Sequence, residues 1–168
     1  MLEVVTLGHP ALRRRADPAP EVTPELRRLA DDMLAVMKQH EGIGLAATQV
    51  NRMVRLFVTR APEDRERVFI NPEVVRTGIE TESREEGCLS IPGPRADVER
   101  PAHVRVQARN RRGRLFSLEA EGMLARVILH ELDHLNGTLF IDHLSDEERE
   151  RVCREYAQGT EASVGDAD

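Results

Sequence analysis

The sequence predicts an α+β fold, in which short antiparallel β-sheets surround a central helix and further helices lie toward the N-terminal and C-terminal ends. Three observations support this fold class. A helical stripe of apolar residues follows Thr23-Pro24, short β-like runs separated by turn residues fill residues 52–118, and a second helical pattern follows at residues 121–135. A block of strands between two helices is typical of an α+β domain.

The first predicted helix begins at Thr23-Pro24. Thr is favoured just before a helix, and Pro fits the first turn, where its missing N–H is not needed. The apolar residues that follow fall on one helical face: Leu26, Leu29, Ala30, Met33, Leu34 and Met37. Residues 42–49 are then too rich in glycine for a helix opening and too apolar for a solvent-exposed loop. We therefore expect their backbone to run close to another part of the molecule.

Residues 52–118 alternate between short β-like runs and turn residues. The runs are rich in β-branched and aromatic side chains, which favour strands. The predicted strands are residues 54–59, 68–71, 74–79, 104–108 and 115–118. The breaks between and after them contain Pro62, Asn71-Pro72, Pro92, Pro94 and residues 110–113.

The C-terminal part is predicted to hold a short strand at residues 138–141 and a last helix. Ser145 and Glu148 have the spacing of a capping box, so the helix is expected to begin there and to end near Ala157. Residues 159–168 are small and acidic, which predicts a disordered segment.

Length and composition limit the classes of protein that fit. At 168 residues and 18.9 kDa the chain suits one domain, expected over residues 1–158. The net charge of -6 and the pI near 5.6 argue against a DNA-binding protein, because phosphate-contacting domains are usually basic. Two cysteines are too few for a disulfide framework, and no apolar N-terminal run suggests secretion or membrane insertion. We therefore expect a cytoplasmic protein without a membrane partner.

The helical pattern at residues 121–135 contains the motif His-Glu-Leu-Asp-His at residues 130–134. Two imidazoles four residues apart lie on one face of a helix, near enough to share a metal ion, and the carboxylate of Glu131 can reach a water bound to that ion. Apolar residues recur at helical spacing before and within the motif: Met123, Leu124, Val127, Ile128 and Leu132. Asn136-Gly137 is a typical helix stop. The pattern therefore predicts a buried metal-binding helix with hydrolase chemistry.

A hydrolytic metal site of this kind needs a third protein ligand and an open position for water. In metzincins the motif continues to a third His, but Phe140 occupies that position here. Thermolysin-like enzymes take a Glu from a later helix, and Glu155 is available, although its neighbours indicate the solvated face of that helix. Cys88 is the stronger candidate, because a thiolate is a good ligand for zinc or ferrous iron and Gly87 before it allows close backbone approach. Cys153 competes on residue type but lies on a helical face between apolar residues.

Three motifs together resemble the peptide deformylases, enzymes that remove the N-formyl group from nascent bacterial and organellar polypeptides. The family signatures G-x-G-L-A-A-x-Q, E-G-C-L-S and H-E-x-D-H-L-x-G match residues 42–49, 86–90 and 130–137. The likeness extends toward both ends and covers nearly the whole chain. Two departures, Leu129 where the family usually has Gln and Asn51 where Gly is common, touch no expected metal ligand or catalytic group.

The resemblance implies a metal centre with one proton-transferring residue. Cys88, His130 and His134 would hold one divalent metal ion with water in the open position, and the resemblance favours Fe(II) over Zn(II), Ni(II) or Co(II). Glu131 would accept the proton of that water and pass it to the departing amine. By family position, Arg100 is the expected partner of Asp133, whose carboxylate would otherwise be costly inside a buried helix.

The resemblance also implies donors for the reacting oxygen and a groove for the substrate. The side-chain amide of Gln49 and the backbone N–H of Leu89 would stabilise the oxyanion that forms on attack at the formyl carbon. The substrate backbone would lie along Gly44 as an added strand. The residues expected to bind substrate are Ile43, Gly44, Glu86, Gly87, Met123 and Val127.

Two other functions stay open on the residues alone. One is a metallopeptidase with the same helical motif, and the other is a non-catalytic module stabilised by metal. The presence of Glu131 and Gln49 argues against the second, since neither residue is required to hold metal. The resemblance implies N-formylmethionyl nascent peptides as substrates and a transient contact with the ribosome.

Overall fold

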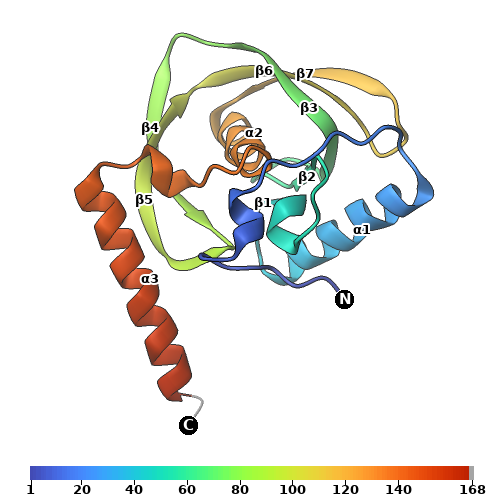
Figure 1. Ribbon diagram of the computed structural model, residues 1–168. Coiled ribbons are helices and arrows are strands. Elements are labelled where there is room, and N and C mark those ends of the chain that lie inside the picture. Colours follow the sequence, from blue (N-terminus) through green and yellow to red (C-terminus); the bar gives the residue numbers. More distant parts are fainter. Residues whose placement is uncertain (167–168) are drawn as a thin grey trace.

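The computed structural model describes residues 1–166 and has the α+β architecture that the sequence predicts (Figure 1). Its elements in chain order are η1 (Pro10–Arg13), α1 (Pro24–Gln39), β1 (Gly44–Ala46), η2 (Ala47–Val50), β2 (Leu56–Thr59), β3 (Arg67–Thr77), β4 (Thr81–Cys88), β5 (Ile91–Pro101), β6 (His103–Arg109), β7 (Leu115–Glu121), α2 (Gly122–Leu135), η3 (Phe140–His143) and α3 (Asp146–Asp166).

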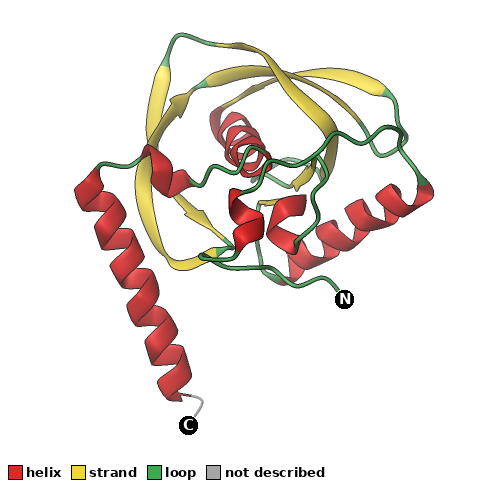
Figure 2. Cartoon of the chain, viewed as in Figure 1, coloured by secondary structure: helices red, strands yellow, loops and turns green. Residues whose placement is uncertain are grey.

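Two antiparallel sheets surround helix α2. The larger sheet has the strand order β1-β2-β3-β6-β7, and the smaller one pairs β4 with β5. In Figure 2 the strands form a ring with α2 at its centre, while α1 and α3 lie outside the ring. This arrangement leaves α2 as the element that both sheets can reach.

Helix α1 begins as the sequence predicts. The Thr23 hydroxyl accepts a hydrogen bond from the backbone N–H of Leu26 at 3.1 Å, and Pro24 occupies the first turn. The apolar face is buried against β1 and β2, where Met33 and Leu45 have no exposed surface. Burial of this stripe fixes α1 against the larger sheet.

Helix α2 is packed on more than one side, which explains its apolar sequence. Ala125, Ile128 and Leu135 lie in a cluster with the stacked rings of Phe57 and Phe69 from the larger sheet. At the C-terminal end of the helix, the Arg55 guanidinium donates to the carbonyl of Leu135 at 3.0 Å and to the Asn136 side chain at 3.0 Å. Such contacts satisfy backbone groups that the end of a helix leaves free.

The strands between residues 44 and 101 differ from the prediction in three places, the first being β1, which was not predicted as a strand. The runs at 68–71 and 74–79 are one strand, β3, with an irregularity between the pairs of Ile70 and Glu73. Strands β4 and β5 are absent from the prediction, because β4 is almost entirely polar and Pro92 and Pro94 read as breaks. The prolines lie in the irregular stretch of β5 between its pairs with Glu86 and Cys88, where no regular ladder bond is needed.

The C-terminal predictions need correction as well. Residues 138–141 do not form a strand; η3 follows Leu139 instead, and the Asp142 carboxylate accepts a hydrogen bond from the Leu139 N–H at 2.9 Å. A short, continuous apolar run does not distinguish the two states. The Ser145 hydroxyl accepts from the Glu148 N–H as predicted for the start of α3.

Helix α3 continues to Asp166, past the end expected near Ala157. No proline interrupts it, and the Thr160 hydroxyl donates to the Tyr156 carbonyl at 3.0 Å on the helix itself. The disordered segment predicted for residues 159–168 is therefore assigned to the helix through residue 166, and residues 167–168 lie outside the described residues.

Candidate metal centre and active site

Cys88, His130 and His134 meet at one point, although they come from two separate elements. The histidines lie one turn apart on α2, with ring centroids 5.1 Å apart, and Cys88 ends β4. The three possible ligand atoms lie within 4.8 Å of one another, and the Cys88 Sγ is 3.3 Å from the His134 Nε2. One sulfur and two imidazole nitrogens at this spacing fit a single divalent metal ion.

Glu131 lies beside this group and is buried, with 3% of its surface exposed. Among the described residues its Oε2 atom has no hydrogen-bond partner. Burial, the largest influence, raises the pKa of its carboxyl from 4.5 to about 7. A carboxyl group in this state can exchange a proton near neutral pH, which suits general acid–base chemistry.

Glu86 is the hydrogen-bond partner of His130. Its Oε1 atom lies 2.8 Å from the His130 Nδ1, and both carboxylate oxygens accept from the Arg100 guanidinium. Burial alone would raise the pKa of Glu86, but the hydrogen bonds from His130 and Arg100 lower it from 4.5 to about 2. Glu86 is thus a carboxylate at neutral pH and occupies Nδ1, which leaves the Nε2 of His130 to face the ligand group.

The predicted pair of Asp133 and Arg100 is confirmed. The Arg100 Nη1 donates to the Asp133 Oδ2 at 3.0 Å, and the His143 Nε2 lies 2.8 Å from the same oxygen. Arg100 belongs to β5 and Asp133 to α2, so the pair connects the smaller sheet to the helix that carries both histidines.

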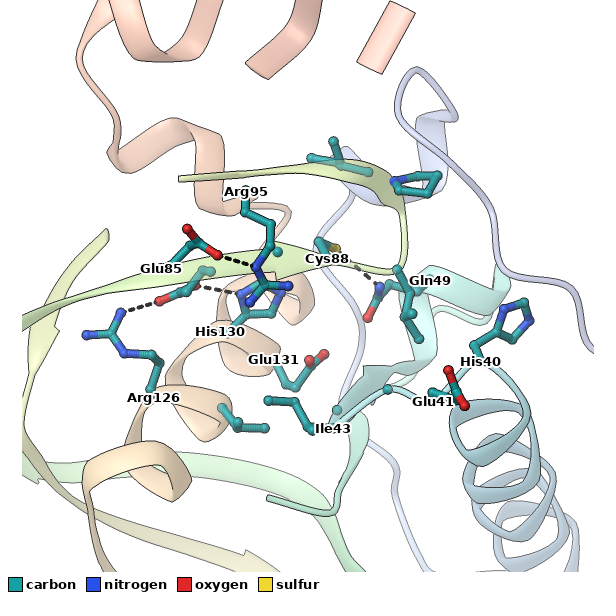
Figure 3. Close-up of a pocket in the computed structure, with 18 of the residues that line it drawn as sticks. His40, Glu41, Ile43, Gln49, Glu85, Cys88, Arg95, Arg126, His130 and Glu131 are labelled. Carbon is teal, nitrogen blue, oxygen red and sulfur yellow. Dashed lines mark hydrogen bonds and ion pairs between the residues drawn. The ribbon is translucent and has the colours of Figure 1, made fainter. Parts of the chain in front are cut away.

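Gln49 is held at the edge of the ligand group by its own hydrogen bonds. Its Oε1 accepts from the Ala46 N–H at 2.9 Å, and its Nε2 donates to the Ser90 hydroxyl at 3.1 Å. The same Nε2 is 3.5 Å from the Cys88 Sγ (Figure 3). The amide therefore presents an N–H donor beside the candidate metal centre in a fixed orientation.

A cavity of about 580 Å³ opens onto these groups. Every site residue predicted from the sequence lines it except His134, which is part of the ligand group. The predicted residues that line the cavity are Ile43, Gly44, Gln49, Glu86, Gly87, Cys88, Leu89, Met123, Val127, His130 and Glu131. Figure 3 shows Glu131 below the His130 ring and Gln49 to the right of it. The cavity is large enough for a side chain and part of a peptide backbone.

The glycine-rich segment runs close to α2, as expected. A Cβ atom on Gly44 would lie 2.5 Å from the Glu131 Oε1 and 2.9 Å from the Val127 Cγ1. On Gly42 it would lie 2.8 Å from the Leu89 Cδ1. Only glycine allows β1 to approach the site this closely.

Sequence reasoning missed several residues of the cavity. Arg126 lies on α2 between the predicted lining residues, and the Glu85–Arg95 ion pair of 2.8 Å lies at the cavity on β4 and β5. His40 and Glu41 follow α1. Of these residues, Arg126 could have been suspected from the sequence, because it is the single charged residue in the apolar part of α2 before His130.

The competing ligand candidates lie elsewhere. Cys153 lies on α3 and packs against a buried apolar cluster, and Glu155 pairs with Arg151 at 3.0 Å on the exposed side of the same helix. The ring of Phe140, at the position of a metzincin's third His, stacks on His130 with centroids 6.2 Å apart. None of the three belongs to the candidate ligand group found among the described residues.

Among residues 1–166, no helix combines the length and apolar character needed to cross a membrane.

Known proteins with similar sequences are peptide deformylases. A peptide deformylase of Cellvibrio japonicus is 45% identical over 166 residues, which cover 98% of this chain and 98% of the relative. One of Azotobacter vinelandii is 49% identical over 154 residues, covering 90% of this chain and 92% of the relative.

The solved structures give the same result. The crystal structure of peptide deformylase from Ehrlichia chaffeensis matches with a TM-score of 0.94 at 32% identity, covering 98% of this chain and 99% of that one. The structure from Legionella pneumophila matches with a TM-score of 0.93 at 34% identity and covers 98% of both chains. The family model described as polypeptide deformylase matches residues 1–150. The chain therefore belongs to the polypeptide deformylase family.

Proposed function

We propose roles for the predicted site residues in the reaction of the family, the metal-dependent removal of the N-formyl group from formyl-methionine at the start of nascent polypeptides, with release of formate. The observation that carries the assignment is the convergence of Cys88, His130 and His134 within 4.8 Å beside the buried carboxyl of Glu131. The matched residues 1–150 support a catalytic domain over residues 1–158.

Cys88, His130 and His134 are proposed to hold one metal ion. When bound, a divalent metal supplies a water of lowered pKa and polarises the oxygen of the formyl group. The thiolate and two imidazoles suit Fe(II), Zn(II), Ni(II) or Co(II), and the likeness to deformylases supports Fe(II) in the cell. Elemental analysis of anaerobically purified protein tests this: iron in equal amount to protein is expected, and zinc alone would contradict it.

Glu131 is proposed to move the proton. Its carboxyl has a pKa raised to about 7 by burial, so it can accept a proton and return it to the departing amine near neutral pH. Gln49 Nε2 and the backbone N–H of Leu89 are proposed to donate to the oxyanion. The fixed amide of Gln49 supports this role, because donors fixed in advance need no reorganisation during the reaction.

The substrate is proposed to lie along β1. Its backbone would pair beside Gly44, where the lack of a side chain leaves room next to Glu131. Its methionine side chain would enter the part of the cavity lined by Ile43, Met123 and Val127, with Glu86 and Gly87 at its border. The relatives from Ehrlichia chaffeensis and Synechococcus elongatus were solved in complex with actinonin, and we propose that this cavity binds it too.

The products of a formyl-methionyl peptide test the function directly. The purified protein loaded with Fe(II) or Ni(II) should release formate and leave the peptide otherwise intact, and added actinonin should slow the release. Release of an amino acid or a shorter peptide without formate would instead indicate a metallopeptidase. Binding of the peptide without any product would indicate a non-catalytic module.

A cytoplasmic location and a transient ribosome contact are proposed from the substrate, because nascent formylated chains emerge at the ribosome. Co-sedimentation with translating ribosomes tests the contact. Recovery of the protein with ribosomes at low salt and its loss at high salt are expected, whereas no recovery at low salt would contradict it.

A further inference from the structure

Arg126 lines the cavity and has a buried guanidinium, but the proposed function gives it no role. It lies on α2 one turn before His130, and 4% of its surface is exposed. Its Nη1 donates to the Glu86 Oε2 at 2.6 Å and to the Val98 carbonyl at 2.8 Å, and its Nη2 donates to the Glu82 carbonyl at 2.7 Å. Figure 3 shows it beneath His130, with its guanidinium directed at the carboxylate that also contacts the His130 ring.

Arg126 is the second guanidinium at Glu86. Arg100 already donates to both oxygens of Glu86 and pairs with Asp133. A second guanidinium in the same buried place is costly unless its geometry is used, because a buried charge loses its hydration. Arg126 supplies the second positive charge for these two carboxylates, and its fixed contacts also orient the carboxylate of Glu86.

The hydrogen bonds divide between the two oxygens of Glu86. Oε1 accepts from Arg100 and lies at the His130 Nδ1, while Oε2 accepts from Arg100 and from Arg126. Arg126 is fixed in turn by two carbonyls of the smaller sheet, Glu82 on β4 and Val98 on β5. The two arginines thus fix the orientation of the carboxylate, which keeps its Oε1 at the His130 Nδ1.

We propose that Arg126 is a positioning residue, which acts through Glu86 to hold the His130 ring with its Nε2 toward Cys88 and His134. This inference rests on the proposed role of His130 as a metal ligand. Partners of a ligating histidine's second nitrogen commonly change metal affinity by about 10-fold to 100-fold when removed.

The test compares Arg126→Met with Arg55→Met. Arg55 is also buried and also contacts α2, but it donates to the carbonyls of Ala16 and Leu135 and to Asn136, not to Glu86. Co(II) affinity is measured by competition with a chromophoric chelator, and the absorption spectrum of the Co(II) form reports the arrangement of the ligands. Unfolding of the metal-free proteins in urea measures stability separately.

Arg126→Met should weaken Co(II) binding by more than about twofold, up to the roughly 10-fold to 100-fold expected for a direct partner of the ligating histidine, and should shift the Co(II) spectrum. Arg55→Met should lower stability while leaving the affinity within about twofold and the spectrum unchanged. Wild-type affinity and spectrum in a folded Arg126→Met protein, or equal changes in both variants, would overturn the proposal. If Arg126→Met does not fold, Arg126→Lys takes its place, and it should show the same shift in smaller measure because one ammonium cannot reproduce the forked contacts.

A double-mutant cycle with Glu86→Gln tests the route. If Arg126 acts through the carboxylate, Arg126→Met should weaken Co(II) binding little further in the Glu86→Gln background. Fully additive losses would overturn the route through Glu86. His130→Ala separates the two levels of the argument: retention of Co(II) there would contradict the proposed ligand role itself, whereas loss of Co(II) there with no change in Arg126→Met would contradict only the role of Arg126.

Discussion

The carboxyl group of Glu131 lies in a poor environment for a charge. It is buried, its Oε2 has no partner among the described residues, and burial raises its pKa to about 7. Glu86, equally buried, has four hydrogen bonds and a pKa lowered to about 2. Two carboxyl groups close to one histidine are thus driven to different protonation states by their partners, which suits one to moving a proton and the other to holding a ring.

The raised pKa of Glu131 predicts a pH-dependent stability cost. The unfolded chain ionises this group above pH 4.5, whereas the folded chain keeps it protonated until about pH 7. The group therefore destabilises the metal-free fold increasingly between these values, by up to about 3 kcal/mol above pH 7. Glu131→Gln should make metal-free protein more stable than wild type at pH 8 but not at pH 4, as measured by urea unfolding. An equal difference at both pH values would refute the shift.

The two cysteines should respond differently to the same substitution. Cys88→Ser replaces a ligand thiolate with a neutral hydroxyl, so most metal affinity should disappear. Cys153→Ser changes a side chain of α3 that packs against a buried apolar cluster, and it should keep both metal and activity. Metal content after dialysis measures the difference, and equal losses from the two proteins would show that Cys88 is not the third ligand.

At the scale of elements, β1 and α2 approach each other more closely than a side chain allows. Gly44→Ala would place a Cβ 2.5 Å from the Glu131 Oε1, so either the strand or the carboxylate must move. Formate release should fall by about 100-fold, since small displacements of a reacting group have effects of this size. Gly159→Ala, on α3 with no atom within 4 Å of its Cβ, is the control and should leave the rate unchanged. Equal rates of formate release for the Gly44→Ala and wild-type proteins would show that the close contact of β1 with α2 is not needed for the reaction.

The Asp133–Arg100 pair predicts how α2 is braced. Asp133→Asn leaves the buried Arg100 with one carboxylate partner fewer and should lower the free energy of unfolding by about 1–3 kcal/mol. The exposed Asp31–Arg111 pair, with both side chains 47% exposed, provides the control: Asp31→Asn should cost less than about 1 kcal/mol. Calorimetric melting of both variants tests this, and an unchanged melting temperature for Asp133→Asn would show that the pair does not stabilise the position of α2.

The elements also show which parts of the fold were predictable. Helices α1 and α2 follow from apolar periodicity and from their capping or stop residues, because both bury apolar residues that recur at helical spacing. Strands β4 and β5 did not follow, since their polar faces and prolines carry no strand pattern, and their pairing depends on contacts far along the chain. The prediction of a strand at residues 138–141 was wrong because a short buried apolar segment is compatible with several local structures.

At the scale of the whole molecule, three sequence segments meet around one helix. The motifs identified which residues belong to the site, since residue type and order are visible in the sequence, and the structure brings residues 42–49, 86–90 and 130–134 to a single cavity. The hydrogen bonds that link Arg126, Glu86 and His130 were not predictable, because they depend on how the smaller sheet packs against α2. Sequence thus indicated the chemistry, and the packing of distant elements determines its geometry.

Across the whole site, Glu131 is proposed to move the proton while Cys88, His130 and His134 hold the metal. The most direct test measures metal content and formate release on the same preparation of Glu131→Ala. Metal should remain at the wild-type level, because Glu131 is not part of the ligand group, and formate release should fall by at least about 100-fold, the usual scale for a general acid–base group. Loss of the metal, or formate release near the wild-type rate with metal retained, would contradict the account.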